Sequence, residues 1–188
     1  MGLFDLALVA RAQGDLPEAA ARGEESRALA QAVGDTRLLA EALAHLGHVA
    51  HAGGDDGRAA ALLGESLRLV RAHGLEADTW RLARILAGLA GVGAAQGQPE
   101  RALRLGGAAA ALAEAAGWPL YAPDQAALDG ALARARPAVD PKAQAVAWDE
   151  GRALTPEQAV NEGLAVEGAT TEAAAAGAAT PDPATARR

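Results

Sequence analysis

Six glycines divide the first 120 residues into regularly spaced segments, and this spacing constrains the fold more than any other feature. Gly14, Gly54 and Gly97 lie in similar short stretches, which read RAQGDLPEAA, HAGGDDGRAA and AAQGQPERAL. A second glycine follows each of them 20 residues later. The stretch therefore recurs after 40 and then 43 residues, which predicts a repeat architecture. The second glycines are Gly34, Gly74 and Gly117.

Apolar residues keep the same register as the glycines. Within the second unit they fall three or four residues apart, which is the spacing of one face of a helix. Asp35 stands where it can cap the start of that helix. Because one helical hairpin cannot bury its own apolar face, we expect the hairpins to stack into an all-α solenoid. The recurring apolar sets are Leu6, Leu46 and Leu89; Val9, Val49 and Val92; Ala19, Ala59 and Ala102; and Leu29, Leu69 and Leu112.

The turn residues resemble those of tetratricopeptide repeats. Leu46-Gly47 stands where that family has a Leu-Gly pair, and Gly54-Asp55 stands at its interhelix turn. Ala59 takes its small packing position. The period exceeds the family's usual ~34 residues, and HEAT-like repeats have a similar period, but the Gly-Asp turn favours the tetratricopeptide interpretation. The resemblance implies a right-handed α-α superhelix with a groove for a protein or peptide partner.

Longer units of this kind are similar to the helical repeat domain of the maltose-regulon activator type. That domain occurs in large LuxR-type and antibiotic-regulatory transcription factors that carry an ATPase module. The most specific part of the resemblance is a W-x-x-G-R-x-L stretch at residues 148–154, followed by E-x-A-V at residues 157–160. In that family the repeats are implied to be a sensor and oligomerisation platform, to which an inducer or partner binds.

The sequence predicts three parts: three hairpin repeats in residues 1–120, the first of them truncated; capping helices in 121–167; and a disordered tail in 168–188. Trp118 and Ala122 each precede a proline, so we expect extended backbone there and a helix over 124–135. Asp140 before a proline, and Thr155 three residues before Gln158, predict the starts of two short capping helices.

Three histidines in one predicted helix raise the question of a metal or catalytic site. On a helix, residues 45, 48 and 51 spread over about 120°, and the Glu of the zinc-protease His pair is missing. In the repeat register, His48 and His51 face the groove, where we expect them to be solvated. We predict no catalytic residue, no metal and no cofactor. The predicted ligand groove comprises Arg11, Glu41, His48, His51 and Arg84.

Composition narrows the classes of function. The chain has 188 residues and a net charge of −7, without a basic cluster, which argues against direct nucleic-acid binding. It has no cysteine, so a disulfide framework and a thiolate zinc site are excluded. No apolar run is long enough to cross a membrane, and we expect a cytoplasmic protein.

The favoured function is a non-catalytic interaction and sensor domain, the C-terminal fragment of an ATPase-linked bacterial transcriptional regulator. A free-standing adaptor that binds a peptide in its groove is one alternative, and a small enzyme using His48 and His51 is another. Only 13 residues precede Gly14, against about 18 helical residues before the other turn glycines, so we expect a truncated first unit. Its apolar residues predict a homodimer, or docking of the regulator's other modules, through residues 3–12.

Overall fold

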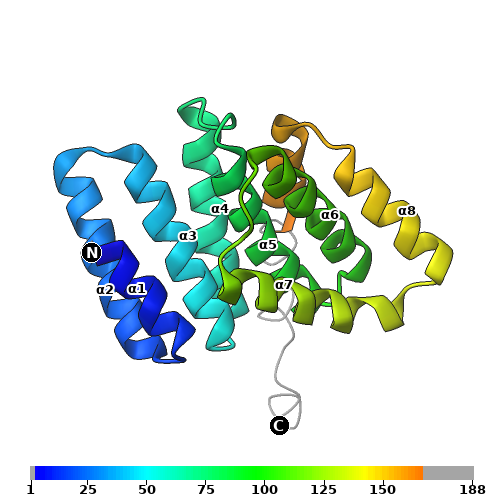
Figure 1. Cartoon of the computed structure of the whole chain (residues 1–188), viewed down its shortest axis with the longest axis horizontal. Helices are drawn as coiled ribbons and strands as arrows, with labels where there is room; N and C mark the ends of the chain where they lie inside the picture. Colours follow the sequence, from blue (N-terminus) through cyan, green and yellow to red (C-terminus); the bar gives the residue numbers. More distant parts are fainter. Residues whose placement is uncertain (1–2, 167–188) are drawn as a thin grey trace, which may run out of the picture.

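The computed structural model describes residues 3–166, and the first six helices form three antiparallel hairpins (Figure 1). Successive hairpins pack side by side, so the chain is an all-α, tetratricopeptide-like repeat superhelix, as predicted. The helices are α1 (Leu3–Ala12), α2 (Leu16–Val33), α3 (Thr36–Ala52), α4 (Asp56–Ala72), α5 (Thr79–Ala95) and α6 (Pro99–Ala116).

The six glycines of the repeat lie in the turns that follow these six helices. All six have φ between 62° and 82°, the left-handed region in which a side chain would be strained. Two of the three hairpin turns are followed by a side-chain cap: Asp15 and Asp55 accept hydrogen bonds from the backbone N–H groups of Glu18 and Arg58, whereas Gln98 at the third turn accepts none. Asp35 caps α3 in the same way, as expected from the sequence.

Small side chains let the helices approach closely. Ala19, Ala59 and Ala102, which correspond in the repeat, are fully buried. At Gly47 a β-carbon would lie 2.6 Å from Cγ of Leu63, so only glycine fits between α3 and α4 there. The main core runs from α3 to the C-terminal helix, whereas Ala10, Ala19 and Val49 form a separate small cluster. The first hairpin therefore lies outside the main core, although α2 packs closely on α3 at Gly23, against Leu46.

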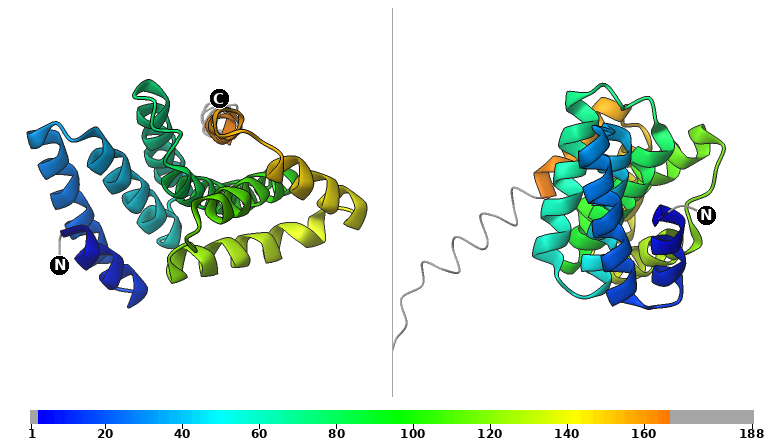
Figure 2. Two further views of the ribbon diagram at one scale, coloured as in Figure 1. Left: turned by 45° about the horizontal axis from the view of Figure 1, so that its top comes forward. Right: turned by 90° about the vertical axis from the view of Figure 1, so that its left-hand side faces the viewer.

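Helix α7 (Ala122–Ala135) leaves the pattern of the hairpins and runs across α5 and α6 (Figures 1 and 2). Its start reaches α1, and buried Leu128 and Leu132 lie in the main core. The expectation that Ala122 is extended is wrong. Ala122 opens the helix with Pro123 in the first turn, where the missing N–H of a proline would be unpaired in any case.

Two further helices follow α7: the first packs at the C-terminal end of the superhelix, and the second lies against α4 and α5, where Gly163 faces Leu67 and Leu89. A short 3₁₀ turn (Arg136–Ala138) leads to α8 (Pro141–Arg152), which packs against α6, and Asp140 caps α8. A last helix covers 156–166, and Thr155 and Gln158 exchange the two hydrogen bonds of a capping box. The predicted tail over 168–188 lies outside the described residues. Within the described part, no helix is long and apolar enough to cross a membrane.

Candidate ligand groove

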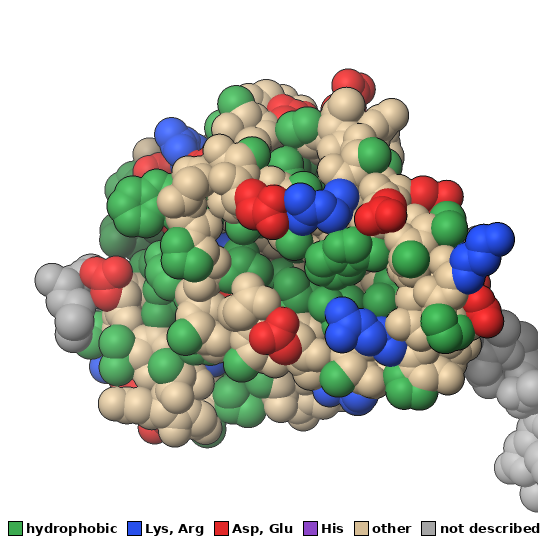
Figure 3. All heavy atoms as spheres, turned by 45° about the vertical axis from the view of Figure 1, so that its right-hand side comes forward, with side chains coloured by type: hydrophobic (Ala, Val, Ile, Leu, Met, Phe, Trp, Pro, Cys, Tyr) green, Lys and Arg blue, Asp and Glu red, His purple; other side chains and the backbone are tan. Residues whose placement is uncertain are grey.

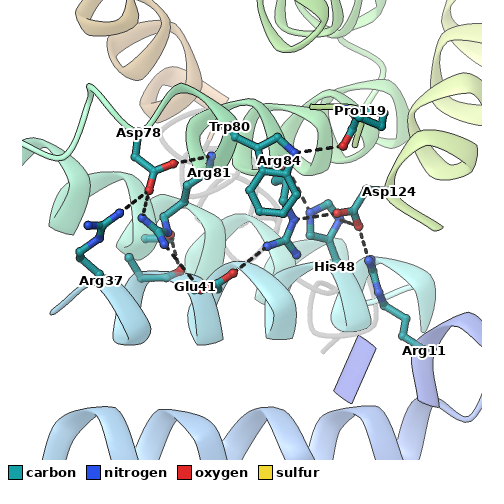
Figure 4. A network of polar contacts seen from close by, with 12 residues as sticks. Arg11, Arg37, Glu41, His48, Asp78, Trp80, Arg81, Arg84, Pro119 and Asp124 are labelled. Atoms are coloured by element: carbon teal, nitrogen blue, oxygen red, sulfur yellow. Dashed lines mark hydrogen bonds and ion pairs between the residues drawn. The ribbon is translucent and has the colours of Figure 1, made fainter. Parts of the chain in front are cut away.

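The concave side of the hairpins holds a buried network of charged residues centred on Asp124 (Figure 4). Asp124, in the first turn of α7, is fully buried and accepts a 2.9 Å hydrogen bond from Nε of Arg84 in α5. Its other carboxylate oxygen pairs with Arg11 of α1. Nη1 of Arg84 also lies 3.4 Å from Glu41 of α3. One carboxylate thus ties together the first hairpin, the third hairpin and α7.

Arg84 is 1% exposed and is surrounded by aromatic rings. Its guanidinium carbon lies 4.6 Å from the ring centre of Tyr121, 5.1 Å from Trp80 and 5.5 Å from Phe4. The indole of Trp80 donates a 3.0 Å hydrogen bond to the carbonyl of Pro119. Because ring faces attract a cation, these contacts stabilise the buried charge. They also hold the segment that leads into α7.

The two buried histidines of α3 are neutral at neutral pH. Burial lowers the pKa of His48 to about 3 and that of His45 to about 4. Nε2 of His48 donates to the carbonyl of Arg84 at 3.1 Å, and its Nδ1 lies 3.8 Å from Asp124. Burial alone would raise the pKa of Asp124, but His48, once it is protonated in acid, and the permanent charges of Arg84 and Arg11 outweigh burial and lower that pKa. Asp124 is therefore ionised.

The structure brings four of the predicted groove residues, Arg11, Glu41, His48 and Arg84, into this network. His51 lies apart and pairs through Nδ1 with Asp56 at 2.5 Å. The expectation of a solvated His48 is wrong, since this residue is 3% exposed. The reason is α7, which covers the concave surface that three hairpins alone would leave open.

Sequence reasoning missed Asp124 as a member of this site. It was expected only as the start of a helix, and 113 residues separate it from Arg11. The one signal in the sequence is its place in the segment that breaks the repeat. The aromatic neighbours of Arg84 were missed as well, because they come from three separate parts of the chain.

An open cleft of about 510 Å³ remains beside the network, between the ends of α1 and α3 and the length of α7. Arg11, His48 and His51 line one side and Arg134 lines the other. In the part of the chain that the structure describes, no group of three or more His, Cys, Asp or Glu residues is placed to hold a metal ion. The chemistry of the cleft is thus that of basic side chains and small apolar ones.

Comparisons with known proteins agree with the architecture. Residues 2–72 match the family model of the tetratricopeptide repeat, which supports a tetratricopeptide-repeat domain in the first two hairpins. Domains of that family usually bind protein partners and are generally non-catalytic. Searches of curated proteins and of solved structures gave no match.

Proposed function

We propose that the chain is a non-catalytic interaction and sensor domain, the C-terminal part of an ATPase-linked bacterial transcriptional regulator. The observation that carries this proposal is the tetratricopeptide match together with the uninterrupted stacking of three hairpins. The regulator context rests on the resemblance of residues 148–160. The docking of α8 against α6 gives that segment a structural role consistent with the resemblance.

In this proposal the two ends of the superhelix differ in role. The C-terminal end is covered by α8, which packs on α6. The N-terminal hairpin carries exposed Val9, Leu29 and Val33, to which the regulator's other modules, another protein or a second copy binds. An effector in the cleft beside Arg11 then contacts α1, α3 and α7 together, so its binding couples to the orientation of the first hairpin.

The same geometry argues against both alternatives, the adaptor and the enzyme. A free-standing adaptor would lay an extended peptide along the concave surface, but α7 crosses that surface and covers Arg84 and His48. An enzyme using His48 and His51 would need both imidazoles accessible, yet His48 is buried and donates to a backbone carbonyl. Both observations favour the sensor and interaction domain.

Site-specific photo-cross-linking in the source cells tests the proposal. A photoreactive residue at Val9, which is 45% exposed, should cross-link to a protein, whereas the same residue at Val146 of α8, 49% exposed, should not. Reading the coding DNA upstream of Met1 in frame tests the regulator context, for which we expect ATPase motifs. Equal cross-linking at both positions would contradict the interaction role. An in-frame stop codon directly upstream would contradict the regulator context.

A further inference from the structure

The cleft beside the buried network has an unusual charge distribution for an acidic protein. Its ionisable lining residues are Arg11, His48, His51 and Arg134, and among the described residues no carboxylate lines it. The remaining walls are small or apolar, from Leu16, Ala52 and the first three turns of α7. A volume of about 510 Å³ lies within the range of small-molecule sites, roughly 300–1,000 Å³.

Arg11 lines this cleft and carries one buried donor that is unpaired, its Nε. The residue is 8% exposed, and its Nη2 is taken by Asp124. Its Nε is buried and makes no hydrogen bond with any described residue. Such a group loses its hydration without compensation, which is unfavourable by about 1–3 kcal/mol or more for a charged donor. A ligand that supplies an acceptor oxygen would remove this penalty.

Arg134 provides the second positive charge, from the last turn of α7. Its side chain is exposed and has no ion-pair partner within the described part of the chain. Arginine presents several N–H donors in a planar arrangement that matches carboxylate and phosphate oxygens. The cleft thus offers one buried and one exposed guanidinium to a single ligand.

We propose that this cleft binds a small molecule carrying a carboxylate or phosphate group, held between Arg11 and Arg134. The inference rests on the proposed sensor function and names the chemical class of the effector. A compact ligand fits better than an extended peptide, because α7 crosses the concave surface and limits the open cleft to the space between α1, α3 and α7. Since the net charge of −7 repels anions at long range, binding depends on these local cations.

Calorimetric titration with citrate at low ionic strength tests the site, with inorganic phosphate as a second probe to separate carboxylate from phosphate recognition. Citrate or phosphate should bind at one site, and trimethyl citrate, which is neutral, should not bind. Arg134→Gln should weaken binding about tenfold, the effect of losing a charged hydrogen bond. Arg136→Gln is the matched control: it is exposed, two residues away and outside the cleft, and should change affinity less than about twofold.

The resonance of the Arg11 Nε–H group gives an independent readout in the unmodified protein. On saturation with citrate it should shift and exchange more slowly with water, because its donor becomes paired. The proposal fails if neither anion binds saturably, if both arginine variants lose affinity equally, or if the Arg11 signal does not change. Tighter binding of the peptide acetyl-Glu-Glu-Glu-amide with the same dependence on Arg134 would also overturn it. Cross-linking through Val9 is unaffected by any of these failures, so the two proposals are tested separately.

Discussion

A single carboxylate, Asp124, organises the charges on the concave side of this protein. It is the shared ion-pair partner of two buried guanidinium groups, Arg11 of α1 and Arg84 of α5, and Arg84 has Glu41 as a second, more distant partner. Buried ion pairs are often no more stabilising than apolar residues of the same shape, but removing one partner leaves an uncompensated charge. The network therefore specifies how α7 meets the hairpins more than it adds to their stability.

Asp124→Asn should destabilise the protein by about 3–5 kcal/mol, because it leaves two buried guanidinium groups facing a neutral amide. Chemical denaturation followed by circular dichroism measures the change. Asp129→Asn is the control: the residue lies on the same helix, is exposed, and accepts one hydrogen bond from Gln125. Its effect should stay within about 0.5 kcal/mol, as is typical of surface substitutions. Equal effects of the two variants would refute a special role for Asp124.

Acid should destabilise the protein through the buried histidines. In the unfolded chain a histidine titrates near its usual pKa of about 6.5, whereas the folded pKa is about 3 for His48 and about 4 for His45. Between these values the unfolded state binds more protons, so stability is full above about pH 6.5 and is lost as the pH falls. At pH 5 each histidine should account for a loss on the order of 2 kcal/mol. The lowered pKa of Asp124 adds a loss in the same direction below about pH 4.

His48→Gln should reduce the difference in unfolding free energy between pH 7 and pH 5 by about 2 kcal/mol, since glutamine does not titrate. His73→Gln, in an exposed position at the end of α4, is the matched control and should leave the difference unchanged. Urea denaturation at the two pH values provides the measurement. If the pH dependence of the His48→Gln variant equals that of the unmodified protein, His48 does not titrate with folding.

At the scale of helices, the sequence predicted what is local and missed what depends on distant segments. The turn glycines and the aspartate caps follow from spacing alone, because φ and capping are decided within a few residues. The burial of His48 could not be predicted in this way. It depends on α7, whose first turn lies more than 70 residues further along the chain. An irregular segment after α6 leads into that helix.

Helices α6 and α8 meet at two glycines, where their backbones are in contact. A β-carbon at Gly151 would lie 1.9 Å from the carbonyl oxygen of Arg104, and one at Gly107 would lie 2.3 Å from that of Trp148. This contact explains the glycine of the W-x-x-G-R-x-L stretch: it allows α8 to lie directly on α6 with Trp148, partly buried, against the main core. The capping function expected of this segment thus depends on backbone approach as well as on the tryptophan.

Gly151→Ala should separate α6 from α8 and destabilise the protein by about 2–3 kcal/mol, the usual effect of overpacking. Gly57→Ala provides the control, because a β-carbon there would meet nothing closer than 3.8 Å in the first turn of α4. That variant should be neutral or more stable by up to about 1 kcal/mol. Denaturant unfolding measures the free energy of unfolding of both variants. If Gly151→Ala leaves that free energy unchanged, α8 is not held against α6 in solution.

On the scale of the whole molecule, the two ends of the superhelix differ in how far neighbouring helices cover them (Figures 1 and 3). At the C-terminal end, Figure 3 shows an apolar hollow rimmed by charges of both signs. A cleft at this end is lined mainly by apolar residues of α6, of α7 and of the segment between them, together with Trp148 of α8. An ion pair between Glu114 and Arg152 joins α6 to α8. At the N-terminal end, α1 has 10 residues whereas α2 has 18, so the last turns of α2 extend beyond their partner helix.

Because α1 is short, residues near the end of α2 are more exposed than the corresponding residues of later repeats. Leu29 in α2 is 48% exposed, whereas its counterpart Leu112 in α6 is 6% exposed, because the 17-residue α5 covers α6 along its length. Val33, one turn further, is 65% exposed. Phe4, expected from the sequence to belong to this surface, instead lies partly buried beside His45 and Arg84. The large apolar side chains exposed on the surface of the first hairpin are thus Val9 of α1 and Leu29 and Val33 of α2.

We expect this surface to make the isolated chain self-associate, with residues 3–12 in the interface. A symmetric dimer would place the same helices of two copies against each other and bury the surface in both. Val9→Glu/Leu29→Glu should shift light-scattering mass toward the monomer without unfolding the chain, since both side chains are about half exposed in the monomer. Val146→Glu, which changes an equally exposed apolar residue of α8 at the other end, should leave the association unchanged.

A stable interface needs about 800 Å² per partner, which is more than three side chains supply, so α1 must contribute along its length. If the unmodified chain stays monomeric at high concentration, the first hairpin's apolar surface does not bind a second copy, and cross-linking at Val9 should then identify a different protein.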